Sequence, residues 1–181
     1  LGPVKEIAQI GAVAGREFSY ELLHAVSGWP APKLNAALRE LVRSELVFQR
    51  GEAPHALFNF KHVLVRDAAT ATLLKKHRMQ LHAAIASALE HRFLEMVAGQ
   101  PETIAYHLAE ADMAERAIPY WLEAGRNAAR RSADVEAIAH LRCGLDAAAR
   151  CPLGPKTERV QLDLLIALAP HLEDFLARLF G

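Results

Sequence analysis

The stretch Leu46-Val47-Phe48-Gln49-Arg50, with Leu57-Phe58-Asn59-Phe60-Lys61 following it after a short loop, decides the fold of the first part of this chain. Both runs are rich in the branched and aromatic side chains that favour strands. The loop between them contains Gly51 and Pro54, which are typical of a turn. The pattern therefore predicts a β-hairpin.

The residues before this hairpin predict three helices. Residues 4–14 are rich in Ile, Val and Ala, and Ser19 is placed to cap a second helix, Tyr20–Ser27. A third helix, residues 32–44, starts with a proline, which suits a first helical turn. Three helices followed by a hairpin is the order of a winged-helix domain, and we expect that domain over residues 1–75.

No strand pattern returns after the hairpin, and the apolar residues follow helical spacing to the end of the chain. Helices are predicted at 62–75, 78–97, 101–111, 115–131, from a capping Asp134 onward, and at 156–180. The fold class is therefore mainly α.

One helical hairpin matches the tetratricopeptide repeat, whose period is about 34 residues. Six positions carry the aromatic, small and apolar residues of that repeat: Trp121, Gly125, Ala128, Ala137, Leu141 and Gly144. Small residues in both helices let the two backbones approach closely. This copy is degenerate, because Ala128 replaces the tyrosine of the repeat and the proline comes late, at Pro152. We expect residues 76–181 to form a truncated α-solenoid of such helical hairpins.

The last predicted helix is rich in leucine, and Pro170 is expected to interrupt it. Because a repeat array normally needs a capped end, we expect residues 160–180 either to fold back on the array or to pair with a second copy of the chain.

Composition places the chain among ordinary globular proteins, with 52% hydrophobic residues. Lys plus Arg and Asp plus Glu are equal at 21 each, so net charge favours neither nucleic acid nor a membrane. The start at Leu1, without a signal peptide, suggests a fragment. Cys143 and Cys151 form no metal or disulfide pattern, and we expect a cytoplasmic protein.

Motifs for catalysis are not recognisable, so neither catalytic residues nor an enzyme activity is predicted. Residues 154–157 contain a Lys-Thr pair, but Pro155 and the missing preceding glycine argue against a phosphate-binding loop. The nine histidines have no metal-ligand spacing; His77 and His82, for example, are five residues apart. No metal site is expected.

DNA binding is the alternative function for the winged helix. The third helix and the wing carry side chains able to contact phosphates and base edges: Lys33, Asn35, Arg39, Arg43 and Arg50. Acidic residues at Glu40, Glu45 and Glu52 lie in the same region and argue against nucleic acid as the partner.

Three segments carry a family resemblance: Ile10–Tyr20, Phe60–Ala69 and Ala117–Gly125. Together they resemble the region that follows the ATPase module in bacterial signalling ATPases of the STAND class, which belongs to the AAA-type ATPases. In that class the ATPase is fused to class III adenylate or guanylate cyclase domains or to transcription regulators. The resemblance spans residues 4–168 and implies an adenylate or guanylate cyclase, or another ATPase, as the full-length parent.

The resemblance also implies a nucleotide contact in that parent. In STAND proteins a winged-helix histidine approaches the phosphates of bound ADP, and by position His62 is its equivalent, with Arg66 and Asp67 orienting the segment. The implied cofactor is ATP or ADP in the parent, and none in this fragment. A purely structural role remains open, in which His62 caps the following helix and Arg66 pairs with Asp67 or a nearby glutamate.

The sequence thus predicts a non-catalytic regulatory and protein-interaction region. Its expected partners are the ATPase domain of the same polypeptide, an unknown protein or peptide on the repeat surface, and a second copy of the chain through the C-terminal helix.

Overall fold

The computed structural model describes the backbone of residues 2–180 and the side chains of residues 2–172. Contacts between Cα atoms divide the chain after His91 into two compact units. The domain boundary predicted after residue 75 lies earlier, at the first residue of helix α5 (Lys75–Arg92). The described residues form ten helices and one three-stranded antiparallel sheet, so the fold is mainly α.

The first unit begins with the three predicted helices, α1 (Gly2–Ala14), α2 (Tyr20–Ser27) and α3 (Ala31–Arg43). The predicted cap of α2 is confirmed, because the hydroxyl oxygen of Ser19 accepts a hydrogen bond from the backbone N–H of Leu22 at 3.1 Å. Such a bond satisfies one of the unpaired donors at the start of a helix.

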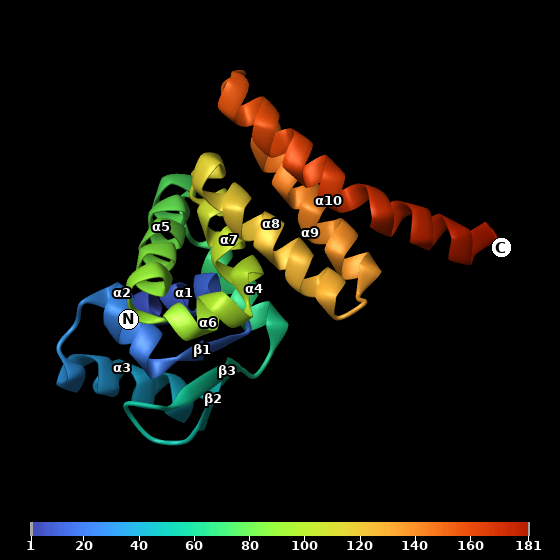
Figure 1. Cartoon of the computed structure of the whole chain (residues 1–181). Helices are drawn as coiled ribbons and strands as arrows, with labels where there is room; N and C mark the ends of the chain where they lie inside the picture. Colours follow the sequence, from blue (N-terminus) through green and yellow to red (C-terminus); the bar gives the residue numbers. More distant parts are fainter. Residues whose placement is uncertain (1, 181) are drawn as a thin grey trace. The chain divides into compact units, whose positions relative to one another are not determined.

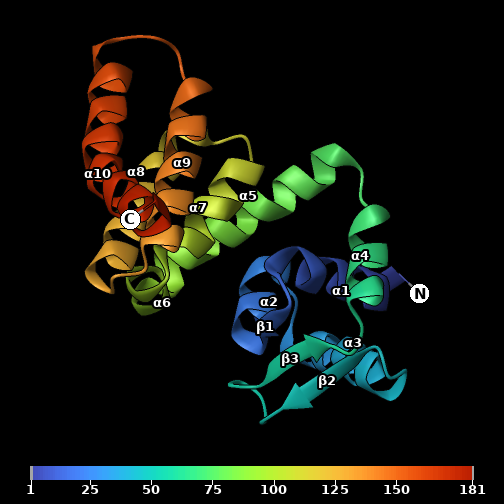
Figure 2. The same ribbon diagram turned by 90° about the vertical axis from the view of Figure 1, so that its right-hand side faces the viewer.

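The predicted hairpin is also confirmed, as strands β2 (Val47–Arg50) and β3 (Leu57–Phe60). A further strand, β1 (Glu17–Ser19), was not predicted and pairs antiparallel with β3, giving the order β1-β3-β2. Figure 2 shows β2 and β3 side by side below α2. Three residues are too few to show the two-residue period of a strand, which explains the omission.

Apolar side chains from the helices and the sheet form one core in this unit, which includes Ile7, Leu23, Leu34, Leu41 and Phe58. A Cβ atom added at Gly11 would lie 2.8 Å from the ring of Phe18, so only glycine fits between α1 and β1. Helix α4 (Val63–Ala71) packs on α1, and the side-chain amide of Gln9 donates to the hydroxyl of Thr72 at 2.8 Å.

The second unit is a series of helices in which consecutive members pack together (Figure 1). They are α6 (Leu94–Gly99), α7 (Pro101–Glu110), α8 (Ala114–Arg130), α9 (Asp134–Ala149) and α10 (Pro155–Phe180). One prediction was wrong here: residues 78–97 are not a single helix, because Phe93 has φ −126° and ψ 45° and separates α5 from α6. The apolar spacing continues across this residue and gives no sign of the break.

The close approach of helices predicted from small residues is confirmed at two glycines. An added Cβ at Gly125 on α8 would lie 2.5 Å from Cγ of Leu141 on α9, and one at Gly144 on α9 would lie 2.8 Å from Leu164 on α10. The predicted cap of α9 was misplaced, because Ala133 is the capping residue and Asp134 is the first helical residue.

Helix α10 continues through Pro170, contrary to the predicted interruption. A proline removes a single N–H donor, and Leu164 and Leu168, buried in the preceding turns, hold this helix to the unit. Neither α10 nor any other helix of the described residues has the length and apolarity needed to cross a membrane. Two of the leucines in this leucine-rich segment, Leu176 and Leu179, lie outside the described side chains.

Candidate functional site

The predicted nucleotide-contacting histidine lies at the start of α4. His62 is the N-cap residue, with extended backbone angles of φ −132° and ψ 136°, and its side chain makes no capping hydrogen bond. The side chain is exposed, and within the described residues it makes no hydrogen bond, ion pair or aromatic ring contact. His62 therefore occupies the capping position at the start of α4, as the structural alternative expected, but it does not cap the helix through its side chain.

Arg66 and Asp67, one turn further along α4, pair with each other. Both Nε and an Nη of Arg66 donate to Oδ1 of Asp67, at 3.0 and 2.8 Å. This confirms the pairing that the sequence left open. The side chains are 33% and 54% exposed, so the pair contributes little to stability.

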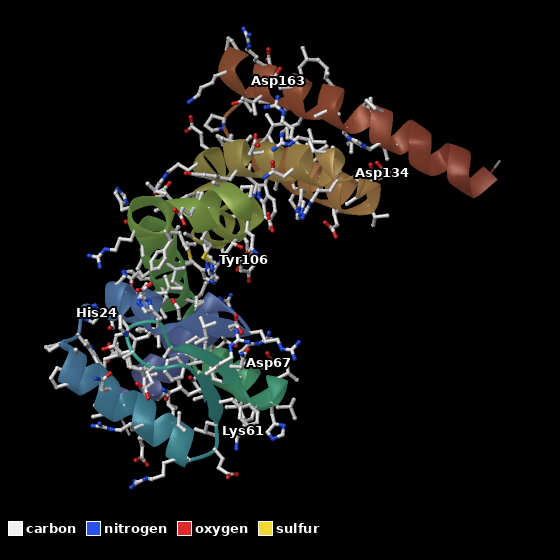
Figure 3. All side chains as sticks on the ribbon, turned by 60° about the horizontal axis from the view of Figure 1, so that its bottom comes forward. His24, Lys61, Asp67, Tyr106, Asp134 and Asp163 are labelled. Carbon is white, nitrogen blue, oxygen red and sulfur yellow. The ribbon has the colours of Figure 1, made fainter. Side chains whose placement is uncertain are left out.

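Lys61 directly precedes His62, and its side chain contacts residues of and before strand β2. Its Nζ lies 3.6 Å from a carboxylate oxygen of Glu45 and 4.8 Å from the centre of the Phe48 ring. Lys61 and Asp67 thus flank His62 in sequence, one on each side; both are labelled in Figure 3.

The residues predicted for DNA contact are partly engaged within the protein. Nζ of Lys33 lies 3.5 Å from the ring centre of Trp29, and Arg43 forms an ion pair of 2.6 Å with Glu40. The other three lie on α3 or at the end of β2: Asn35 is half-buried, and Arg39 and Arg50 are exposed.

The histidines do not converge on a metal. In the part of the chain that the structure describes, no group of three or more His, Cys, Asp or Glu side chains could hold an ion. His82 and His107 are buried, a detail that composition alone could not reveal.

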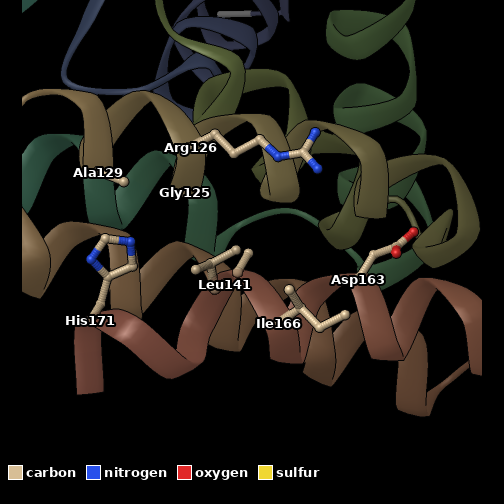
Figure 4. A pocket seen from close by; sticks show the side chains of 8 residues that line it. Gly125, Arg126, Ala129, Leu141, Asp163, Ile166 and His171 are labelled. Carbon is tan, nitrogen blue, oxygen red and sulfur yellow. The ribbon is translucent and has the colours of Figure 1, made fainter. Parts of the chain in front are cut away.

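A pocket of about 320 Å³ lies in the second unit, among helices α8, α9 and α10. Its apolar lining consists of Gly125, Ala129, Leu141, Ile166 and Ala167, and its polar lining of Arg126, Asp163 and His171. Figure 4 shows Arg126 and Asp163 toward one end, His171 at the other, and Leu141 and Ile166 between them.

The histidine of this pocket is fixed by a carboxylate. Nδ1 of His171 lies 3.0 Å from Oδ1 of Asp134, and the two side chains are only 18% and 9% exposed. Because an ionised carboxylate only accepts hydrogen bonds, Nδ1 carries the proton, which leaves Nε2 of a neutral ring as an acceptor.

The two charged residues at the other end are uncommitted. Among the described residues neither Arg126 on α8 nor Asp163 on α10 has a hydrogen bond or an ion pair, although both line the same pocket. Both side chains are exposed.

Sequence reasoning missed the polar residues of this pocket. The repeat pattern identified Gly125 and Leu141, and Arg126 directly follows the glycine, so one wall could have been found. Asp163 and His171 lie on α10, beyond that hairpin, and only the packing of α10 against α9 brings them to the pocket.

Comparison with known proteins gives two matches. Residues 138–181 match a family described as the RP005 N-terminal alpha-helical domain, a match that covers most of α9 and all of α10. Uncharacterized protein R02095 of Rhizobium meliloti (strain 1021) is 27% identical over 173 residues. No solved structure matches the chain.

The alignment with the Rhizobium meliloti protein covers 95% of this chain but 17% of the relative. The chain therefore spans less than a fifth of that protein's length, and it is similar over both of its units to one part of a much longer polypeptide.

Proposed function

We propose that this chain is a regulatory and protein-interaction region of a larger cytoplasmic signalling ATPase, linked to an adenylate or guanylate cyclase. In this proposal the first unit is a winged-helix domain that responds to the nucleotide bound by the ATPase domain. The second unit is a tetratricopeptide-like array that binds a partner. The much greater length of the Rhizobium meliloti relative supports a place within a longer protein.

One observation carries the proposal: the His62 side chain is exposed and uncommitted at the first turn of α4, where the hairpin ends. A protonated or neutral imidazole can donate a hydrogen bond to a phosphate oxygen. Arg66 lies on the same helix, and its exposed pairing with Asp67 leaves it able to turn toward a phosphate.

Calorimetry with ADP on the full-length protein tests this role. Replacing His62 with alanine removes a hydrogen bond to a charged group, which is worth roughly 1.5–3 kcal/mol, so affinity for ADP should fall about tenfold or more. His77→Ala, another exposed histidine of the same unit, is the matched control and should leave the affinity unchanged.

The fragment alone should not bind nucleotide appreciably, because the ATPase domain supplies the rest of the site. Equal ADP affinities for the parent and its His62→Ala variant would refute the sensor role. The upstream reading frame gives a second test: a Walker motif and a cyclase domain should be encoded there.

The second unit is proposed to bind other proteins, including a second copy of itself through α10. Two apolar side chains of this helix outside the pocket are more than half exposed, namely Leu162 at 56% and Leu165 at 51%. Such exposed apolar stripes commonly mark interaction surfaces. Size-exclusion chromatography with light scattering should find a dimer, and a strict monomer would eliminate the pairing.

DNA binding by α3 is the competing proposal. Lys33 and Arg43 would have to leave Trp29 and Glu40 before contacting phosphates. A salt-dependent anisotropy titration with duplex DNA separates the two functions, since phosphate contacts give affinities that fall steeply with salt.

A further inference from the structure

The pocket of the second unit carries charged groups of both signs toward one of its ends. Arg126 extends from α8 and Asp163 from α10, and they do not pair with each other (Figure 4). Because both unpaired side chains line the same pocket, a ligand group held in it can contact the two opposite charges together. That group must offer an acceptor to Arg126 and a donor to Asp163.

The remainder of the lining defines the rest of the ligand. Leu141 and Ile166 lie between the charged end and His171, and Ala129 and Ala167 add apolar surface. This surface suits an aliphatic side chain, whose transfer from water is favourable. Position 125 of the lining must be glycine, since any larger residue there would collide with Leu141.

The backbone of an extended peptide meets both requirements at once. Each residue presents a carbonyl oxygen, which can accept from the guanidinium of Arg126, and an N–H, which can donate to the carboxylate of Asp163. At the far end, Nε2 of His171 accepts from a further N–H, and the hydrogen bond to Asp134 holds the ring in place.

The size and exposure of the pocket favour a peptide over a free small molecule. A volume of about 320 Å³ is at the lower end for ligand sites and holds one residue with parts of its neighbours. Ile166 is 63% exposed, and Arg126 and Asp163 are exposed as well, so a chain can pass through the pocket. Pockets for small ligands normally enclose about 70–90% of the ligand surface. This pocket is lined partly by exposed side chains, so it would enclose less of a small ligand than that.

We propose that the pocket formed by Arg126, Leu141, Asp163, Ile166 and His171 binds an internal aliphatic residue of an extended peptide, held by its backbone between Arg126 and Asp163. This inference rests on the protein-interaction role proposed for the second unit and names the chemistry of its partner. It is independent of the nucleotide role of His62.

The test uses the complete 181-residue chain and acetylated, amidated pentapeptides in which alanines flank one central residue. Chemical shifts of the labelled protein are followed by NMR up to millimolar peptide. The peptide with central leucine should shift the methyl resonances of Leu141 and Ile166, and the peptides with central aspartate or lysine should bind more weakly.

Two charge-removing variants examine the backbone contacts. Arg126→Gln and Asp163→Asn should each weaken binding of the leucine peptide about five- to tenfold, as expected for loss of a hydrogen bond to a charged group. Arg142→Gln and Asp146→Asn remove the same charges from exposed positions on α9 outside the pocket and should bind like the unmodified chain.

Ile166→Ser removes apolar surface from a mostly exposed position and should weaken binding while leaving the fold intact. Circular dichroism of each variant checks that fold.

Four results would overturn the inference: no shift at these methyl groups, equal binding of all central residues, affinities unaltered by Arg126→Gln and Asp163→Asn, or binding of free leucine but not of the peptide. Binding that maps to another surface would remove this site while preserving the interaction role. The ADP measurements on His62→Ala are unaffected by any of these outcomes.

Discussion

A Cβ atom added to Gly125 would lie 2.5 Å from Cγ of Leu141, a separation that side chains in contact do not adopt. Gly125 belongs to α8 and Leu141 to α9, so the absence of a side chain at one residue sets how closely the two helices pack.

Gly125→Ala should therefore destabilise the protein. Overpacking of a core costs about 1–3 kcal/mol, and the better helix propensity of alanine offsets about 1 kcal/mol of it. We expect a net loss of about 1 kcal/mol in the free energy of unfolding, measured by urea denaturation. Gly99→Ala is the control, since nothing lies within 4 Å of its added Cβ.

Leu141→Ala should relieve the collision, so that Gly125→Ala becomes neutral or stabilising in that background. A double-mutant cycle measures this coupling. Purely additive effects of the two substitutions would show that the predicted clash is not what destabilises the single variant.

Ser19→Ala should lower the free energy of unfolding by about 1 kcal/mol, because the backbone N–H of Leu22 loses its acceptor at the start of α2. Ser87→Ala, at an exposed position inside α5, should change it little and serves as the control. If both substitutions prove equally mild, the cap contributes nothing measurable.

Cys143 should react slowly with iodoacetamide near neutral pH. Partial burial of its thiol, followed by the negative charge of Asp146, raises the pKa of Cys143 and so reduces the fraction of reactive thiolate. The rate is measured against pH in a Cys151→Ser background and compared with a free cysteine peptide.

Asp146→Asn should accelerate that reaction, since it removes the second cause of the raised pKa. Asp112→Asn, in the turn after α7, is the control. A rate profile that coincides with the peptide's would contradict the assignment.

Glu115 on α8 and Lys156 on α10 should titrate as a pair. The hydrogen bond and the positive charge of Lys156 lower the pKa of Glu115 below its ordinary value, and Glu115 in turn raises the pKa of Lys156. A lowered carboxyl pKa in the folded state adds stability above the unfolded-state pKa, and this is lost as pH falls through the folded-state value.

NMR titration of the Glu115 carboxyl carbon measures this shift. Lys156→Ala should return the midpoint to the ordinary glutamate range, as should high salt, because both side chains of the pair are largely exposed to solvent. Arg159→Ala, on the next turn of α10, should leave the midpoint of the Glu115 titration unchanged. If Glu115 of the unmodified chain titrated with the midpoint of an ordinary glutamate, its pairing with Lys156 would be contradicted.

Local features of the fold followed from the sequence because they are encoded within a few neighbouring residues. The apolar spacing predicted the helices, the two β-favouring runs predicted the hairpin, and Ser19 was identified as the cap of α2. The small residues at Gly125 and Gly144 correctly predicted close helix packing, since their effect needs only the adjacent helix.

Features that join distant segments of the chain could not be predicted from the sequence. Strand β1 exists because β3, some forty residues later, supplies its hydrogen bonds.

The sequence by itself determined most of the helical segments, where the hairpin lies and which positions must be small, because these depend on local periodicity and residue size. Only the tertiary structure brought Arg126, Asp163 and His171 to one pocket and set His171 against Asp134, 37 residues away. Helix packing places such residues together, and no pattern within a single helix records which neighbour will lie across from it.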